Sequence, residues 1–159
     1  MATKEKKQER GGVIPYYIEE GKILMMFMQP SNSKFGGDKF QIAKGKVETN
    51  ETPQEGAFRE AKEELGLFGP NVETADPLGR FGTIHVFVAK IKNPDMFGDT
   101  TNETEATAWW TPEQFQAEGR GWQKPIIKAA VRKITKLENL DGKRNTEAPA
   151  MDRPGGASL

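Results

Sequence analysis

The segment from Gly45 to Leu67, GKVETNETPQEGAFREAKEELGL, constrains this chain more than any other part of its sequence. Thr52 can cap a helix that begins at Pro53, and the glutamate three positions after Thr52 completes a capping box. Gly66 can end that helix, because the left-handed conformation found at helix ends favours a residue without a Cβ. The pattern therefore predicts a helix over residues 53–65.

The predicted helix has two chemically different faces when its residues are placed at about 100° steps. One face is apolar and is expected to be buried; it consists of Phe58, Ala61 and Leu65. The nearly opposite face carries the carboxylates of Glu60, Glu63 and Glu64. Like charges at this spacing repel each other, so this face is either solvated or bound to a divalent cation. Ligand sets made only of oxygen favour Mg²⁺ or Mn²⁺ over zinc.

The spacing of the charged residues and glycines in this segment resembles the signature of the Nudix hydrolases, R-E-U-x-E-E-x-G-U preceded by a spaced glycine and glutamate, where U is apolar. The matching positions are Gly45, Glu51, Arg59, Glu60, Glu63, Glu64 and Gly66. The family hydrolyses a nucleoside diphosphate linked to another group, X. The resemblance implies a Mg²⁺ or Mn²⁺ cofactor held by Glu60, Glu63 and Glu64, with the backbone carbonyl of Gly45 as a further ligand. It also implies that Arg59 pairs with Glu51 and fixes the loop before the helix.

The resemblance leaves open the base that activates the attacking water, because members of the family use either a glutamate of the signature or a later carboxylate. The signature candidates are Glu60 and Glu63. Glu103 and Glu105 precede Trp109 in an order similar to a pattern common in the family, and we favour Glu103 as an additional ligand or base, with a surface acid as the alternative.

Several other residues are candidates for contact with a substrate. Lys44 and Lys46 flank Gly45 and could touch phosphates, with a solvated surface as the alternative. Four aromatic residues could stack on a nucleobase, with core packing as the alternative for each, and the first of them is counted among the substrate-binding candidates: Trp109, Trp110, Phe35 and Phe81. His85, the single histidine, is either a base or a packing residue. The basic side of the last expected helix could contact RNA or polyphosphate, or be solvated: Lys128, Arg132 and Lys136.

Composition excludes several classes of protein. Lys plus Arg and Asp plus Glu both number 23, so the net charge gives no argument for binding nucleic acid or membrane. There is no cysteine, which excludes disulfides, zinc–thiolate sites and thiol catalysis. The N-terminus MATKEKKQER lacks the apolar region of a signal peptide, and the longest apolar run, Ile23–Met28, is too short to span a membrane. We expect a cytoplasmic protein without membrane contact.

The order of the expected elements predicts an α/β fold, a Nudix-type α/β/α sandwich with a mixed central sheet. Strands are expected at residues 13–18, 22–28, 39–42, 84–89 and 106–110. Helices are expected at residues 53–65, from 111 and at 124–137, with a hairpin turn at 19–21 and loops at 30–38, 68–76 and 93–102. The length favours one domain, residues 11–140, between a mobile charged arm at 1–10 and a disordered tail at 141–159.

The substrate is less constrained than the chemistry. The run Ala43–Glu48 resembles the P-K-G-h-V-E run that enters the signature in dinucleoside-polyphosphate hydrolases, with Ala43 in place of proline. A dinucleoside polyphosphate or another nucleoside polyphosphate is therefore the favoured substrate. Removal of pyrophosphate from an RNA 5′ end and hydrolysis of ADP-ribose, nucleotide sugars or oxidised dNTPs remain alternatives, as does a non-catalytic nucleotide-binding module. The oligomeric state is open, with a homodimer as one option.

Overall fold

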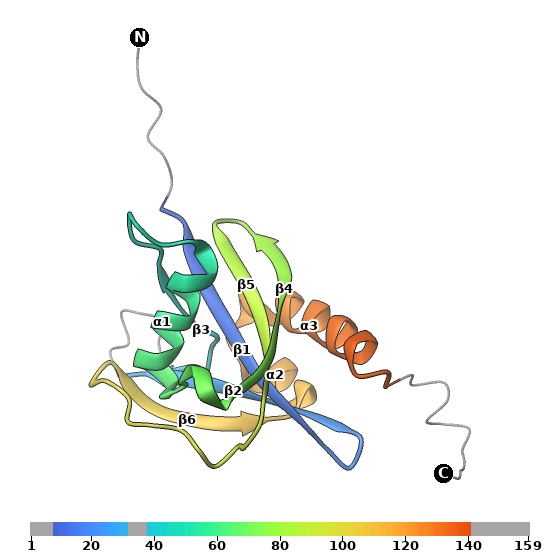
Figure 1. Ribbon diagram of the computed structural model, residues 1–159. Coiled ribbons are helices and arrows are strands. Elements are labelled where there is room, and N and C mark those ends of the chain that lie inside the picture. The colour runs from blue at the N-terminus through green and yellow to red at the C-terminus, as the bar shows by residue number, and fades with distance from the viewer. Residues whose placement is uncertain (1–7, 32–37, 141–159) are drawn as a thin grey trace.

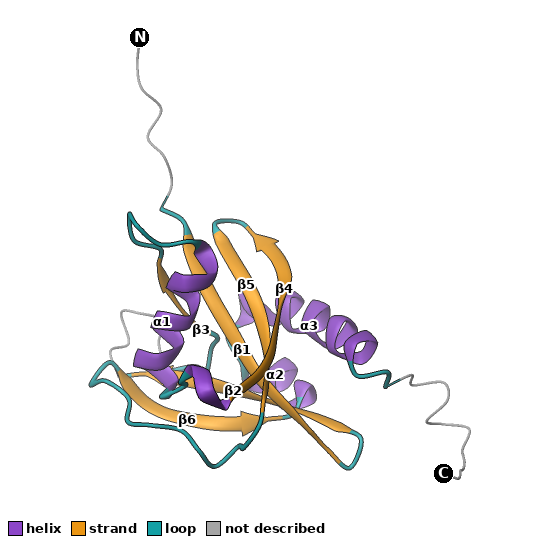
Figure 2. Ribbon diagram, viewed as in Figure 1, coloured by secondary structure: helices purple, strands orange, loops and turns teal. Residues whose placement is uncertain are grey.

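The computed structural model describes residues 8–31 and 38–140, and its centre is a mixed β-sheet (Figures 1 and 2). The strands are β1 (Arg10–Glu19), β2 (Lys22–Pro30), β3 (Ala43–Lys46), β4 (Val72–Phe81), β5 (Ile84–Ile91) and β6 (Thr104–Trp110). The helices are α1 (Pro53–Leu65), α2 (Pro112–Glu118) and α3 (Lys124–Leu137), with short 3₁₀ turns η2 (Gly69–Asn71) and η3 (Gly121–Gln123).

Strand β1 organises the sheet, whose order is β4-β5-β1-β2-β6. It runs parallel to β5 and antiparallel to both β2 and β3. Its first residues, 10–13, pair with β3, whereas residues 16–19 pair with β2. Strands β2 and β3 therefore share β1 as a partner at different positions along its length.

Helix α1 has the boundaries that the sequence predicts. The capping box between Thr52 and Glu55 is formed, and Gly66 adopts the left-handed conformation with φ 79°. The helix lies on the sheet through small residues, since Ala57 and Ala61 are fully buried. A Cβ on Gly11 of β1 would approach Ala57 N to 2.8 Å, so the close contact between β1 and α1 requires glycine at this position.

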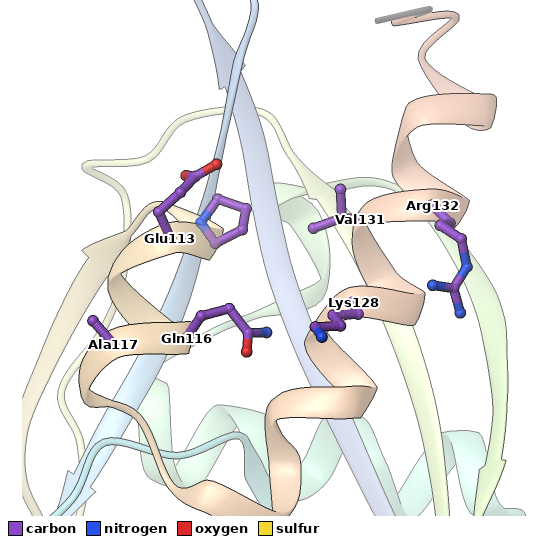
Figure 3. A pocket seen from close by; sticks show the side chains of 7 residues that line it. Glu113, Gln116, Ala117, Lys128, Val131 and Arg132 are labelled. Carbon is purple, nitrogen blue, oxygen red and sulfur yellow. The ribbon is translucent and has the colours of Figure 1, made fainter.

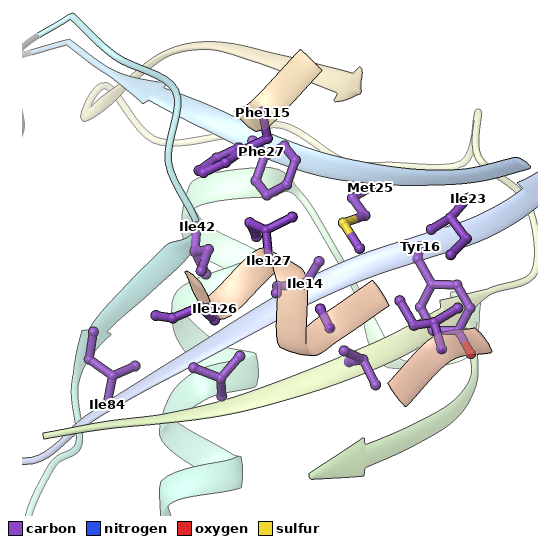
Figure 4. Close-up of a cluster of buried hydrophobic side chains, with 14 residues drawn as sticks. Ile14, Tyr16, Ile23, Met25, Phe27, Ile42, Ile84, Phe115, Ile126 and Ile127 are labelled. Carbon is purple, nitrogen blue, oxygen red and sulfur yellow. The ribbon is translucent and has the colours of Figure 1, made fainter. Parts of the chain in front are cut away.

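The face of the sheet opposite α1 carries a cluster of buried apolar side chains, which α2 and α3 cover (Figure 4). Phe115 of α2 and Ile127 of α3 are fully buried there against Phe27 of β2. Aromatic contacts connect the layers, with ring centroids 4.4 Å apart for Phe27 and Phe115. Helices on both faces of a mixed sheet confirm the predicted α/β/α sandwich.

Two strands differ from the prediction. Residues 68–76 were expected as a loop because they include the run Gly69–Asn71. They contain η2, which is formed by this run, and the start of β4. Strand β4 tolerates Pro77 and Gly79 because it is an edge strand with a register shift between these residues. The short strand expected at 39–42 instead occupies Ala43–Lys46, and Gln41 makes only an isolated bridge to Met28.

The remaining predicted segments agree with the structure or fall outside it. The hairpin turn is formed, with positive φ at both Glu20 and Gly21, as a type I′ turn requires. Residues 1–7 of the expected arm, Phe35 and the expected tail lie outside the described residues. Residues 9 and 10, expected in the arm, contact the sheet region, because Val47 N donates a hydrogen bond to Glu9 O at 2.9 Å and Arg10 starts β1. Within the described part of the chain, no helix has both the length and the apolar character of a membrane span.

Glu138, just after α3, connects this helix to the sheet. Its carboxylate accepts hydrogen bonds of 2.8 Å from Tyr16 Oη and from Lys90 Nζ. Burial acts to raise the pKa of Glu138, but the bonds from Lys90 and Tyr16 outweigh it and the pKa is lowered. A lowered pKa means that this contribution to stability is present above the unfolded-state value, near 4.3, and is lost as the pH falls through the folded-state value.

We therefore expect Glu138→Gln to lower the free energy of unfolding by about 1–2 kcal/mol at pH 7, measured by urea denaturation. The difference from the wild type should shrink below about pH 4, because both proteins then carry a neutral group at this position. Glu73→Gln is the matched control: Glu73 lies 4.0 Å from the same Lys90 but is half exposed, and its substitution should cost under about 0.5 kcal/mol. Equal effects of the two substitutions at pH 7 would contradict this account.

Candidate active site

A pocket of about 560 Å³ lies where α1, β3 and the start of β6 come together, and one of its walls is acidic. Glu60 and Glu64 reach it from α1, one helical turn apart. Glu103, immediately before β6, lines the same pocket. The negative charge of Glu103 helps to raise the pKa of both helix carboxylates, so the three groups are close enough to interact electrostatically.

Gly45 lets the backbone of β3 approach the Glu60 carboxylate. A Cβ built at this position would overlap Cδ and both carboxylate oxygens of Glu60. The side chain of Glu60 is only 15% exposed, and burial raises its pKa even though Arg59 donates a hydrogen bond to it. The absence of a side chain at Gly45 thus creates a position where a backbone strand and a carboxylate face each other at close range.

Glu64 is the most perturbed acid in the pocket. Its Oε1 accepts a hydrogen bond of 3.1 Å from Lys44 N. Burial raises the pKa of Glu64 to about 8, and repulsion from Glu60 adds to the effect. Two crowded, partly buried carboxylates with raised pKa values form a site that a cation would stabilise, because the cation offsets both the repulsion and the loss of hydration.

Arg59 connects the loop after β3 to α1. Its Nε and Nη2 donate to the two oxygens of Glu51, at 2.6 and 3.1 Å, and Nη2 also donates to Lys46 O at 2.8 Å. Nη1 donates to Glu60 Oε2 at 3.0 Å. The bonds from Arg59 lower the pKa of Glu51, which also accepts a hydrogen bond from Glu48 N. The expected pair of Arg59 and Glu51 is therefore present in the structure.

Glu63 lies beside this network and is more open than its neighbours. Its side chain is 46% exposed, and its Oε2 lies 3.6 Å from Arg59 Nη1. Among residues 8–31 and 38–140, no three acidic or histidine side chains already converge as a finished cation site. The donor set still fits a hard cation, since it offers only oxygen ligands around a backbone strand that Gly45 leaves uncovered. The carboxylates would have to turn toward the cation on binding it.

The pocket is also lined by basic residues, which we call its basic wall. They are Arg10, Lys44, Lys46 and Arg120. Burial lowers the pKa of Lys44, while attraction to Glu64 opposes the change and the positive charges of Arg10 and Arg120 add to it. The Lys44 Nζ also lies 5.9 Å from the ring centroid of Trp122. The pocket thus brings an acidic wall and a basic wall together around one solvent-accessible space.

The structure separates the remaining candidates from this pocket. Glu105 is exposed on β6 and is not among the residues that line it, unlike Glu103. Trp109 packs edge-on against Tyr17 with centroids 4.8 Å apart, and its Nε1 donates to Pro94 O. His85 Nε2 lies 2.6 Å from a carboxylate oxygen of Glu9.

Other candidates lie in the second layer of helices or in a neighbouring cavity. Trp110 belongs to the cluster under α2 and α3 and contacts Phe40. Phe81 lines an adjacent cavity described below. Lys128 and Arg132 line a groove of about 650 Å³ between α2 and α3, which is larger than the acidic pocket but is mostly apolar (Figure 3).

Four polar or aromatic residues of the pocket are not among the candidates predicted from the sequence: Arg10, Gln41, Arg120 and Trp122. Arg10 was assigned to the arm, and the others lie outside any recognisable motif. They reach the pocket through contacts between distant segments, such as the hydrogen bond of 3.0 Å from Arg120 N to Phe40 O. No local sequence pattern marks such contacts.

Comparison with known proteins identifies the family to which this fold belongs. An uncharacterized Nudix hydrolase, orf19, of Rhodococcus erythropolis is 34% identical over 122 residues, which cover 67% of this chain and 64% of that protein, less than two thirds of its length. The C. elegans Ap4A hydrolase, in a binary complex, aligns with TM-score 0.67 and 18% identity over 82% of this chain and 99% of that chain. The NUDIX domain of Shewanella oneidensis NrtR, complexed with ADP ribose, aligns with TM-score 0.63 and 13% identity over 82% and 91% of the two chains. A family model for the NUDIX domain matches residues 7–130, most of the chain, and the protein therefore belongs to the Nudix family.

Proposed function

We propose that this protein is a metal-dependent hydrolase that cleaves the diphosphate linkage of a nucleoside diphosphate joined to another group, X. The observation that carries the proposal is a single pocket lined by the carboxylates Glu60, Glu64 and Glu103 together with basic residues. Acidic groups can hold a divalent cation, while basic groups can hold phosphate oxygens. A pocket with both walls fits a substrate whose negative charge lies between cation and protein.

The proposed roles are those that the signature implies, supported by where the residues lie. Glu60, Glu63 and Glu64 and the Gly45 carbonyl would hold Mg²⁺ or Mn²⁺, which when bound would offset phosphate charge and lower the pKa of a bound water. Arg59 would act as a positioning residue, since its bonds to Glu51 and Glu60 fix α1 relative to the loop after β3.

The base remains a choice between a glutamate of the signature and Glu103. Glu103 is exposed and lines the pocket, so it can accept a proton from a water there without first being uncovered. Glu63 is 46% exposed and next to Arg59, and is the second candidate. Comparing Glu103→Gln with Glu105→Gln separates the role of a carboxylate that lines the pocket from that of a surface carboxylate two residues away.

A dinucleoside polyphosphate is the substrate that we favour. Lys44 and Lys46 line the basic wall in the run that resembles dinucleoside-polyphosphate hydrolases. The structural likeness to an Ap4A hydrolase is compatible with this choice, and that to an ADP ribose complex keeps other nucleoside diphosphates in view. Gln41 lines the pocket, is 5% exposed, and its Oε1 has no hydrogen-bond partner among the described residues, so it can accept a bond from a substrate N–H or O–H.

The activity can be tested with a substrate panel in Mg²⁺ or Mn²⁺: diadenosine polyphosphates, ADP-ribose, NADH, dNTPs and 5′-triphosphate RNA. We expect metal-dependent cleavage of one class, and a loss of kcat of about 100-fold or more in Glu60→Gln and Glu64→Gln because cation ligands are removed. Glu113→Gln, at the α2–α3 groove, is the matched control and should retain full activity. Failure of the folded wild type to cleave any member, or equal activity of all variants, would refute the proposal.

Substitution of Gly45 tests whether β3 and Glu60 form one cation site. Gly45→Ala should displace the Glu60 carboxylate and weaken Mn²⁺ binding by about 10–100-fold in calorimetric titration. Gly69→Ala is the control, because a Cβ there meets no atom within 4 Å. Unchanged Mn²⁺ affinity in folded Gly45→Ala would remove β3 from the site.

Replacing Arg59 by lysine keeps the charge but removes the paired hydrogen bonds to Glu51. We expect Arg59→Lys to lower kcat/KM by about tenfold or more while the circular-dichroism spectrum stays native, since only the position of the carboxylates is disturbed. Arg80→Lys, which alters an exposed ion pair with Glu9, should leave kcat/KM unchanged. If Arg59→Lys were as active as the wild type, the charge alone would suffice and the positioning role would be wrong.

A further inference from the structure

A second cavity, of about 380 Å³, adjoins the proposed active pocket. The residues that define its character are Arg10, Phe81, Thr83, Trp122, Pro125 and Ile126. Two of them, Arg10 and Trp122, also line the active pocket, so they form the border between the two spaces. The volume lies within the range of roughly 300–1,000 Å³ that is typical of ligand pockets.

The two cavities differ sharply in chemistry. The active pocket is lined by carboxylates and by cations such as Lys44 and Arg120. In the second cavity Arg10, at the border, is the one charged lining residue, and the rest of the surface is mostly aromatic, aliphatic or backbone. A ligand that crosses the border therefore passes from a charged environment into one that suits a planar, weakly polar group.

Trp122 lies at this border, next to a residue that is anchored by burial and a hydrogen bond. Its side chain is exposed to solvent, with 50% relative accessibility for the residue, and it is the sole aromatic among the large apolar residues that are exposed in the described part of the chain. The next residue, Gln123, is fully buried, and its Oε1 accepts a hydrogen bond of 2.7 Å from Ile42 N, just before β3. Burial in the core thus does not account for the position of Trp122, and the backbone beside it is tied to the segment that leads into β3.

We propose that the second cavity binds the nucleobase of the second nucleoside of the substrate, and that Trp122 is the surface on which this base stacks. The phosphate chain would lie in the active pocket and pass Arg10, whose charge can contact it at the border. Lys44 near the indole face places a cation where the phosphates and the base meet. This inference rests on the proposed hydrolase function. It specifies X as a second nucleoside, joined through the phosphate chain, whose base stacks on Trp122.

The test compares diadenosine tetraphosphate with adenosine 5′-tetraphosphate, which differ only in the second adenosine. Stacking on an aromatic side chain is lost in Trp122→Ala, so KM for the dinucleotide should rise by about tenfold or more, while KM for the mononucleotide changes less than about threefold. Trp122→Phe keeps a ring and should restore most of the affinity. Near-native circular dichroism and thermal unfolding of each variant ensure that the buried Gln123 anchor is intact.

Binding of the same two compounds in EDTA gives a readout that does not need turnover. The dinucleotide should quench the fluorescence of the wild type more than the mononucleotide does, and this difference should vanish in Trp122→Phe, where the other two tryptophans remain. Equal quenching of the wild type by both compounds, or an unchanged KM for the dinucleotide in Trp122→Ala, would overturn the subsite. If the wild type cleaved neither compound nor any panel member, the hydrolase proposal would fail, whereas selective binding of the dinucleotide would still support the stacking site.

Discussion

The guanidinium of Arg59 is the interaction on which the candidate site depends. It contacts Glu51 in the loop, the carbonyl of Lys46 in β3 and Glu60 in α1, so three separate segments are fixed by one planar group. A planar donor set suits this task because its fork matches a carboxylate and still leaves a further donor for another partner. Loss of this guanidinium would still leave the hydrogen bond of 3.1 Å from Lys44 N of β3 to Glu64 of α1, but not the link to the loop.

The cost of this arrangement is the crowding of carboxylates that are partly removed from water. The raised pKa values of Glu60 and Glu64 express that cost, since burial opposes their charge. Arg59 offsets part of it for Glu60, and the Lys44 N–H does so for Glu64. A site that is electrostatically unfavourable in isolation favours a bound cation, and the basic residues that line the same pocket then favour the anion that accompanies the cation.

The parts of the structure governed by local physics could be predicted from the sequence. Helix α1 was predicted with its observed ends because the capping box at Thr52 and the glycine at 66 act within one turn. The start of strand β4 was not, because the run Gly69–Asn71 just before it signals a loop, whereas the pairing of β4 with β5 is a long-range contact. The same limit applies to the site: the acidic wall is encoded on one helix, but Arg10, Arg120 and Trp122 reach the pocket only through tertiary contacts.

The most direct test of the central claim is whether a cation couples the two walls of the pocket. Calorimetry can measure the affinity for adenosine 5′-(α,β-methylene)diphosphate, which has no cleavable bridging oxygen, with and without Mg²⁺, in the wild type and in Glu64→Gln. The account predicts that Mg²⁺ tightens binding by about tenfold or more in the wild type and has little effect in the variant. Equal tightening in both proteins, or wild-type binding that does not respond to Mg²⁺, would contradict it.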